Sequence, residues 1–292
     1  MTLTRVLTAL VLMPAAIAIV LFTPTWAVAI AVAVLTILAL REYFALGDAI
    51  GHRAYRLWTI FSALALIYIQ WWPITLKNRG KVVGLAMFAT EHFYRKEASY
   101  SFLVFLVFVL GLTVLTLFIR RPLVETLPAA GISSSAFLLV AFPLSFAVCL
   151  HGIDLVYDGP RLLLFTLALI WASDTAAYFA GRAFGKHPLA PHISPKKTWE
   201  GSVAGMLGSL AIAYGLHFWL TIPLPHLFAM AALGNIAGQM GDLLESAYKR
   251  SAGVKDSGAL LPGHGGILDR IDALILCIPV IWYYLVLVNP HL

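Results

Sequence analysis

The sequence has few charged residues and almost no cysteine. Only 12% of its 292 residues are charged, whereas 61% are hydrophobic. Soluble domains have about 25% charged and about 45–50% apolar residues, so this composition excludes an ordinary soluble enzyme, a disordered chain and a collagen-like fibre. The two cysteines, Cys149 and Cys277, both lie inside apolar runs. They form neither a metal-binding spacing nor a disulfide framework, and we expect them to be small buried side chains.

The chain also lacks the strong alternation of polar and apolar residues that a membrane β-barrel needs. No internal repeat or low-complexity linker divides it. Its apolar residues instead form long runs, and a helix that crosses a bilayer needs about 20 such residues. The sequence therefore predicts an all-α, polytopic integral membrane bundle of about nine transmembrane helices. The expected spans are residues 7–22, 25–40, 57–72, 102–119, 132–150, 162–180, 201–222, 227–240 and 271–288.

Lysine and arginine are unevenly distributed over the loops between these spans. With the N-terminus in the cytoplasm, 14 of them lie on the cytoplasmic side and six on the other side. Cytoplasmic loops carry such an excess, which favours this orientation. The net charge of +6 then reflects anionic lipid headgroups rather than a nucleic-acid partner. Residues 73–101 fit the pattern least well, and their short apolar stretch 82–89 is compatible with an interfacial or re-entrant helix.

Polar residues that are unusual in a membrane are concentrated in the second half of the chain. Residues 171–272 contain nearly all of them, and the first 150 residues contain no convincing chemical site. We therefore expect residues 1–150 to be a transmembrane scaffold. Residues 151–292 would be the catalytic half of the same continuous membrane domain.

The sixth and eighth expected spans each carry a polar face. Asp174, Tyr178 and Arg182 share one face of the sixth span by their helical spacing. A carboxylate at membrane depth costs a few kcal/mol unless it is paired or hydrated, so Asp174 should face a cavity or a bundle interior. A simple ion pair with Arg182 is the structural alternative.

In the eighth span, Asn235, Gln239 and Asp242 share a face that leads to the cytoplasmic end. Glycines 234, 238 and 241 lie on an adjacent face and allow a neighbouring helix to approach closely. The polar stripe should therefore point into the protein. A hydrogen-bonded packing seam is the alternative to a substrate-binding face.

The loop between residues 181 and 201 combines hydroxyl and ammonium groups. Pro195 prevents a helix from continuing through it, and the groups around it are Ser194, Lys196, Lys197 and Thr198. This combination suits a phosphate, although a basic loop beside the membrane has the same composition.

Residues 246–272 form the most specific pattern, with four basic groups and three carboxylates around a turn rich in glycine and proline. Glycines in this turn allow close backbone approach to a ligand. Carboxylates opposite basic groups suggest Mg²⁺ with phosphate, because Mg²⁺ is usually held by one or two carboxylates and substrate phosphates. His264 is a candidate for proton transfer or for positioning the loop.

This segment closely resembles the signature of the phosphatidate cytidylyltransferases, also called CDP-diacylglycerol synthases. Every fixed position of that signature is met between Ser246 and Asp272, and residues 174–178 and 194–201 are similar to the family too. The resemblance implies that CTP and phosphatidate react to give CDP-diacylglycerol and pyrophosphate. It also implies Mg²⁺ dependence, a metal centre on Asp242 and Asp269 that a monovalent cation such as K⁺ can join, and an active site on the cytoplasmic face of a bacterial inner membrane. A homodimer is expected by analogy.

Together these arguments assign two sets of candidate residues besides the metal ligands. The catalytic candidates are Asp174, Lys249, Arg250, Lys255, Asp256, His264, Arg270 and Asp272. The substrate-binding candidates are Tyr178, Ser194, Lys196, Lys197, Thr198, Asn235, Gln239, Ser246, Gly265 and Gly266. Two alternatives stay open: a related CTP-dependent transferase for another lipid phosphate, and a membrane transporter. The transporter is disfavoured because the first half lacks matching interrupted spans and the polar groups gather at one membrane face.

Overall fold

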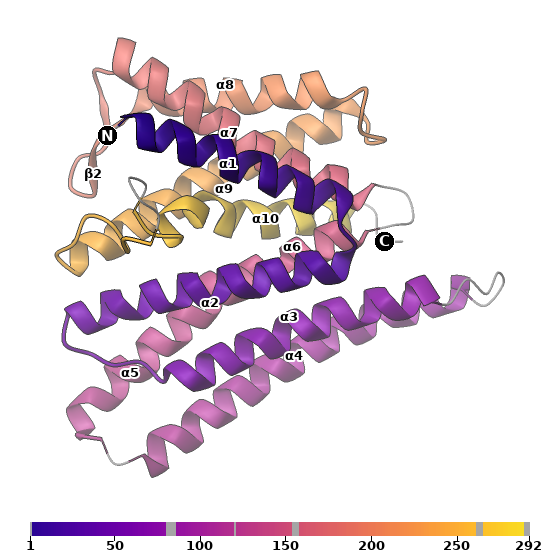
Figure 1. Cartoon of the computed structure of the whole chain (residues 1–292). Helices are drawn as coiled ribbons and strands as arrows, with labels where there is room; N and C mark the ends of the chain where they lie inside the picture. The colour runs from indigo at the N-terminus through magenta and orange to yellow at the C-terminus, as the bar shows by residue number, and fades with distance from the viewer. Residues whose placement is uncertain (1, 80–85, 120, 154–157, 261–264, 289–292) are drawn as a thin grey trace.

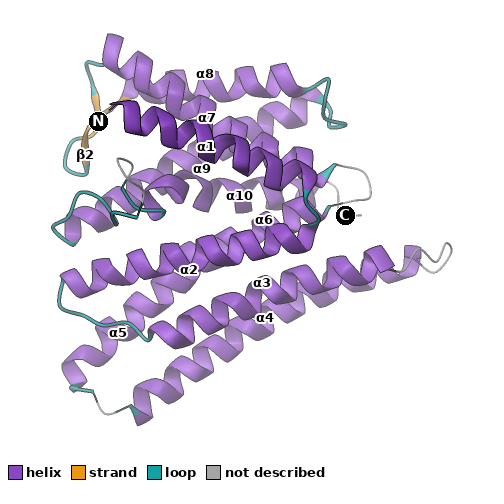
Figure 2. Cartoon of the chain, in the orientation of Figure 1, coloured by secondary structure: helices purple, strands orange, loops and turns teal. Residues whose placement is uncertain are grey.

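The computed structural model of the chain is a bundle of helices with one small two-stranded hairpin (Figure 1, Figure 2). It describes residues 2–79, 86–119, 121–153, 158–260 and 265–288. The elements are α1 (Thr2–Phe22), α2 (Thr25–Ala49), α3 (Arg56–Arg79), α4 (Ala86–Phe118), α5 (Leu123–Ala136), the π-helical turn η1 (Phe137–Ala141), α6 (Phe142–Gly152), α7 (Gly159–Phe184), β1 (Pro188–Ala190), β2 (Ser194–Thr198), α8 (Trp199–Leu216), α9 (Leu224–Ser251) and α10 (Leu268–Val288).

Each predicted span overlaps one helical rod of the described chain, although the expected span 201–222 is helical only to Leu216. α5, η1 and α6 follow one another without a break and together cover the expected span 132–150. Six rods are long and apolar enough to cross a membrane by length and composition. They are Thr25–Ala49, Tyr100–Phe118, Leu123–Gly152, Gly159–Phe184, Leu224–Ser251 and Leu268–Val288. The predicted fold class, an all-α polytopic membrane protein, is confirmed.

Residues 73–101, which fit the charge pattern least well, connect the third and fourth spans. α3 continues to Arg79, and α4 begins at Ala86 as one long helix. Residues 80–85, which include the first half of the apolar stretch 82–89, lie outside the described residues. The rest of that stretch forms the first turn of α4, and therefore belongs to a long helix and not to a separate interfacial one.

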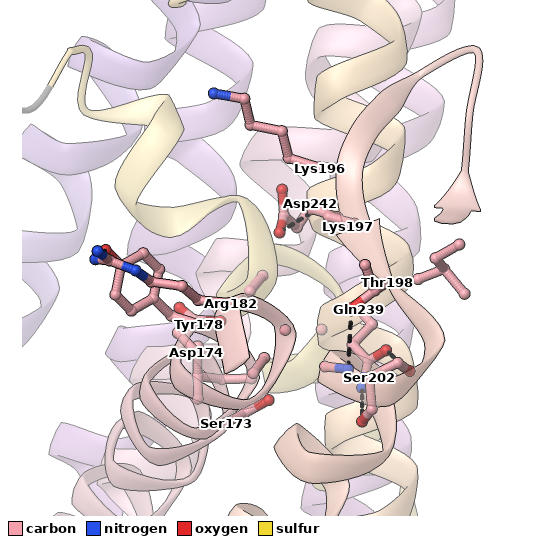
Figure 3. Close-up of a pocket in the computed structure, with 17 residues that line it drawn as sticks. Ser173, Asp174, Tyr178, Arg182, Lys196, Lys197, Thr198, Ser202, Gln239 and Asp242 are labelled. Carbon is pink, nitrogen blue, oxygen red and sulfur yellow. Dashed lines mark hydrogen bonds and ion pairs between the residues drawn. The ribbon is translucent and has the colours of Figure 1, made fainter. Parts of the chain in front are cut away.

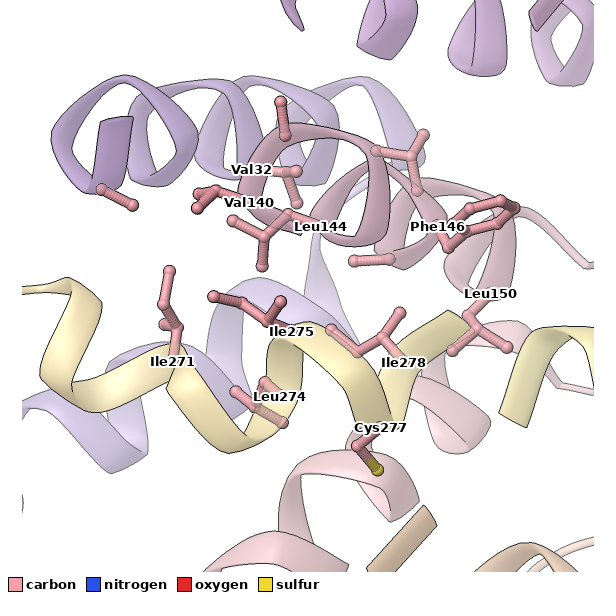
Figure 4. Packing of buried hydrophobic residues seen from close by; sticks show 14 of the residues in the cluster. Val32, Val140, Leu144, Phe146, Leu150, Ile271, Leu274, Ile275, Cys277 and Ile278 are labelled. Carbon is pink, nitrogen blue, oxygen red and sulfur yellow. The ribbon is translucent and has the colours of Figure 1, made fainter. Parts of the chain in front are cut away.

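The core lies where α6 and α10 meet, against α2 (Figure 4). Leu144 and Leu150 of α6 face Ile275 and Ile278 of α10, and all four side chains are buried. Large apolar side chains also cover the outside of the bundle; Leu123, for example, is 90% exposed. Such a surface suits lipid and not water, because hydrocarbon tails solvate it without penalty.

The polar connections gather at one end of the bundle. In Figure 1 the hairpin, the α9–α10 loop, the α2–α3 turn and the N-terminus of α1 all lie at the left end. The most extensive packing in the second half joins α7 to α8 and α9 to α10. These four helices therefore carry the polar end that the sequence motifs marked.

Small residues permit the closest of these approaches. A Cβ at Gly241 of α9 would collide with the backbone carbonyl oxygen of Asp272 in α10. Because that oxygen belongs to a helix backbone, it cannot move aside as a flexible side chain can.

We predict that Gly241→Ala separates α9 from α10 and lowers stability by about 1–3 kcal/mol, the usual penalty of overpacking. Gly215→Ala in α8 is the matched control, since nothing lies within 4 Å of a Cβ there. Alanine is a better helix former than glycine by about 1 kcal/mol, so the control should be neutral or more stable. Thermal unfolding of both purified variants in detergent measures the difference, and equal melting temperatures would contradict the close packing.

Candidate functional site

A cavity of about 700 Å³ opens at the polar end, between α7, α8, α9 and the hairpin (Figure 3). It brings together residues from three separate sequence motifs. The predicted site residues that line it are Asp174, Tyr178, Lys196, Lys197, Thr198, Gln239 and Asp242. The motifs therefore converge in space although they are up to about seventy residues apart in the chain.

An ion pair between Lys197 of β2 and Asp242 of α9 crosses this cavity. The Lys197 ammonium lies 2.5 Å from Asp242 Oδ2, and both side chains remain about one third exposed. Asp174 of α7 lies close enough to interact electrostatically with Asp242, Lys197 and Arg270. The cavity thus holds two carboxylates, one of them paired with a lysine, an arrangement in which a metal ion or a bound phosphate could replace one partner of that pair.

Arg182 does not form the ion pair that would make Asp174 purely structural. Its Nη1 donates to the Tyr178 hydroxyl at 3.3 Å, and the ion pairs of the described residues include no Asp174–Arg182 pair. Both arginine and tyrosine line the cavity. Figure 3 shows them on the same side of α7 as Asp174.

Beneath the cavity floor a hydrogen-bond network joins α7, α8 and α9. Asn235 has no exposed surface, and its Nδ2 donates to Ser173 Oγ at 2.6 Å and to Ser209 Oγ at 2.9 Å. Gln239 Nε2 donates to Asn235 Oδ1 at 2.7 Å. Asn235 therefore belongs to a packing seam, the structural alternative considered for it, whereas Gln239 sits at the boundary between that seam and the cavity.

The residues expected to form a phosphate-binding loop form a hairpin instead. β1 and β2 pair antiparallel, with Ala190 opposite Ser194. Thr198 ends the hairpin and caps α8, because its hydroxyl accepts the backbone N–H of Gly201 at 3.2 Å. Lys196 and Lys197 lie in the second strand, so the hairpin carries both ammonium groups to the cavity.

The hairpin is fastened to the start of α8 by His187 and Glu200. His187 Nδ1 lies 2.6 Å from Glu200 Oε1. The pKa of Glu200 is lowered to about 2, because its own backbone N–H and the His187 side chain donate to the carboxylate. The carboxylate therefore stays ionised across the physiological range, and this anchor persists.

A second charged cluster lies where α9 ends and α10 begins. The Lys249 ammonium lies 2.6 Å from Asp269 Oδ1 and also pairs with Glu245. The Asp269 carboxylate accepts two further bonds, from the backbone N–H groups of Ser257 at 3.0 Å and of Gly266 at 2.8 Å. Asp269 thus holds the α9–α10 loop as well as Lys249, and it does not line the 700 Å³ cavity.

The structure also reveals a residue that no sequence motif indicated, Glu42 of α2. Its carboxylate accepts the backbone N–H groups of Ile267 at 2.9 Å and of Leu268 at 2.8 Å, and the Ser257 hydroxyl at 3.0 Å. The first N–H groups of a helix lack partners within the helix and carry partial positive charge. Glu42 therefore caps α10 from the N-terminal half of the chain.

Two glycines of the signature segment make room for Glu42. A Cβ at Gly258 would lie 2.7 Å from Glu42 Oε1, and one at Gly266 would collide with Oε2. The close approach at Gly266 is thus made by the Glu42 carboxylate. No sequence signal marked Glu42, because it follows Arg41 just beyond the expected span 25–40, and only the structure extends this helix to Ala49.

The other predicted residues surround these two clusters. Arg250 donates to the backbone oxygens of Ile193 and Val254 and so ties the hairpin turn to the end of α9. Lys255, Asp256 and Arg270 are exposed, and Ser246 is buried. Asp272 lies outside the main cavity, in a narrow groove between α2, α9 and α10. Gly265 has a φ of +81°, which favours glycine, and His264 lies outside the described residues.

We predict that Glu42→Gln loosens the start of α10, because an amide has one acceptor oxygen and an NH₂ that faces N–H donors. Each buried donor left unpaired costs about 1–3 kcal/mol. Glu125→Gln, in the first turn of α5, is the matched control and should cost about 0.3–1 kcal/mol. Thermal unfolding and faster hydrogen exchange at Ile267 and Leu268 measure the effect. Unchanged exchange at these two amides would contradict the capping role.

Comparison with known proteins identifies the family to which this sequence is similar. The cytidylyltransferase family matches residues 3–288. The phosphatidate cytidylyltransferase of Haemophilus influenzae is 45% identical over 134 residues, which cover 44% of this chain and 46% of that protein. The phosphatidate cytidylyltransferase of Staphylococcus haemolyticus is 41% identical over 160 residues, which cover 50% of this chain and 59% of that protein. The one from Bacillus subtilis is 40% identical over 131 residues, which cover 44% of this chain and 49% of that protein. The chain spans about half the length of these relatives in the matched segments. Because the family match extends over nearly the whole sequence, the chain belongs to the cytidylyltransferase family.

Proposed function

We propose that this chain transfers the cytidylyl group of CTP to phosphatidate and produces CDP-diacylglycerol and pyrophosphate. The observation that carries the proposal is the convergence of Lys196, Lys197, Asp174 and Asp242 in one cavity at the polar end of a membrane bundle. Membership of the cytidylyltransferase family supports the nucleotide, and the names of the three relatives support the lipid acceptor.

In this reaction a phosphate oxygen of phosphatidate attacks the α-phosphorus of CTP. The bond from that phosphorus to the oxygen bridging to the β-phosphorus breaks, and pyrophosphate leaves with the bonding electron pair. Both reactants are anionic, so positioning and cationic groups supply most of the catalysis. Lys196 and Lys197 bind phosphate as point charges, and Arg182 offers a bidentate contact from the opposite wall.

The carboxylates of the site fit a role in holding Mg²⁺. Among the described residues no three histidine, cysteine, aspartate or glutamate side chains converge as a metal cluster. Mg²⁺, however, is commonly held by one or two carboxylates together with substrate phosphates and water. Asp242 carries the Lys197 ammonium and Asp269 carries the Lys249 ammonium, so each expected ligand already binds a cation.

We therefore propose that Asp242 binds Mg²⁺ in the cavity. Asp269 is kept as a second ligand by the family resemblance alone, because it does not line that cavity, and K⁺ is the monovalent cation expected from the same resemblance. Bound there, Mg²⁺ would supply positive charge to offset the charge on the departing pyrophosphate. The protein's own contribution is to hold the two carboxylates: α9 and Lys197 hold Asp242, and the loop amides of Ser257 and Gly266 hold Asp269.

The placement of the cavity supports an active site on the cytoplasmic face of a bacterial inner membrane. The N-terminus of α1 lies at the same end as the hairpin (Figure 1), and the distribution of lysine and arginine favours a cytoplasmic N-terminus. Phosphatidate then keeps its acyl chains in the bilayer while its headgroup enters between the helix ends. A homodimer is part of the proposal by family analogy alone.

We predict that purified protein forms CDP-diacylglycerol from radiolabelled CTP and phosphatidate in mixed micelles. Lys197→Ala should lower kcat/KM by about 10²–10³-fold, as the loss of one charge-stabilising group commonly does. Lys186→Ala is the matched control, since Lys186 is exposed just before the hairpin and does not line the cavity. A Lys197→Ala variant as active as the control would contradict the role of the cavity.

The same assay with other nucleotides and other lipid phosphates distinguishes a related transferase. Solute flux into liposomes without turnover would instead indicate a transporter.

We predict a metal requirement that depends on Asp242. Chelation with EDTA should abolish turnover, and Asp242→Asn should raise the Mg²⁺ concentration needed for half-maximal activity by at least tenfold. Mn²⁺ binding followed by electron paramagnetic resonance gives a readout independent of activity. Asp158→Asn is the control for charge, because Asp158 is exposed outside the cavity and is not a candidate site residue. Full Mn²⁺ binding by the Asp242→Asn variant would remove Asp242 from the metal site.

A further inference from the structure

A second cavity, of about 1140 Å³, lies at the α2–α3 turn beside the end of α4. None of its lining residues belongs to the first cavity. No sequence motif marked it, and the proposed reaction does not use it. Its walls come only from the N-terminal half of the chain.

One side of this second cavity is cationic. Arg53, Arg56 and Arg121 line it together with a single carboxylate, Asp48, which pairs with Arg56. The exposed Arg53 side chain has no hydrogen bond or ion pair with any described residue. Arg121 Nη1 donates to the backbone oxygen of Arg53 at 2.5 Å, which fixes its guanidinium at the rim. The cavity therefore has an excess of positive charge that the protein does not neutralise.

A buried hydroxyl points to a ligand at the same place. Tyr55 lines the cavity and is only 4% exposed, yet its hydroxyl has no hydrogen-bond partner among the residues that the structure describes. The Arg121 guanidinium lies 4.5 Å from the centre of the Tyr55 ring, so the ring is held in position. A buried hydroxyl without a partner is costly unless a bound group supplies the missing bond.

Exposed apolar side chains line the same cavity. Leu57 is 86% exposed and Phe61 is 62% exposed. Trp58 also lines it and donates from Nε1 to the Phe108 backbone oxygen at 3.0 Å. A ligand that combines an anionic group with apolar chains would satisfy both kinds of lining residue.

We propose that the second cavity binds one anionic phospholipid of the leaflet that faces the candidate active site. Its phosphate contacts Arg53 and the Tyr55 hydroxyl, and its acyl chains run along Leu57 and Phe61. The α2–α3 turn lies at the same end of the bundle as the hairpin (Figure 1). Basic pockets at the cytoplasmic surface bind such headgroups, because the cytoplasmic leaflet is rich in anionic lipid.

The test uses the full chain in nanodiscs and quenching of Trp58 fluorescence by brominated lipids. The contribution of Trp58 is the difference between the wild-type protein and Trp58→Phe. We expect brominated phosphatidylglycerol to quench this contribution at least threefold more effectively than brominated phosphatidylcholine at equal mole fraction. Arg53→Gln combined with Tyr55→Phe should abolish the preference, whereas Arg41→Gln, the loss of an exposed arginine on nearby α2, should preserve it.

Several outcomes would overturn the proposal. Equal quenching by the two lipids would show that the cavity does not select charge. Equal effects of Arg53→Gln and Arg41→Gln would show a general surface potential and no site. Release of the lipid by millimolar inorganic phosphate would identify a free-phosphate site, and a change of oligomeric state in the Arg53→Gln variant by native mass spectrometry would identify a contact with a second copy. Because the readout does not involve CTP, failure of the proposed reaction would leave this test intact.

Discussion

The bond between Glu42 and the start of α10 joins the two halves of the bundle at its polar end. The Glu42 carboxylate accepts the helix N–H groups of Ile267 and Leu268. It also accepts the Ser257 hydroxyl, and the backbone N–H of Ser257 in turn donates to Asp269. An unpaired charge among apolar helices is costly, so every acidic group here needs a defined donor. The chain of bonds from α2 to Asp269 and Lys249 follows from that requirement. The α9–α10 loop is positioned by residues on both sides of it.

The sequence predicted the helices because the bilayer sets their length, and each apolar run became one rod. It also predicted polar faces on the sixth and eighth spans, and Asp174 and Asp242 of these faces line the cavity. It grouped Asp269 and Asp272 with them, and neither of these two lines it. It did not predict the β1–β2 hairpin, whose two strands are too short to show a periodic pattern. Nor did it predict Glu42, because its partners are more than 200 positions away and no local pattern records such a contact.

Asn235 illustrates how the same polar stripe can serve two purposes. The stripe on α9 starts as a buried seam at Asn235, passes Gln239 and ends at Asp242 in the cavity. Helical spacing places all three residues on one face of α9, but it does not say which of them the neighbouring helices cover. Serines on α7 and α8 pack against Asn235 and bury the inner part of the stripe. Only the outer part, at Gln239 and Asp242, lines the cavity and is open to a substrate.

The position of Glu42 has a consequence for the biogenesis of the protein. Glu42 is synthesised 225 residues before Ile267, and ribosomes add about 5–20 residues per second. For roughly 10–45 s the carboxylate therefore has no helix terminus to cap. These contacts of Glu42 with Ile267 and Leu268 can form only after α10 has been synthesised, so a chain truncated before α10 would leave the carboxylate without them.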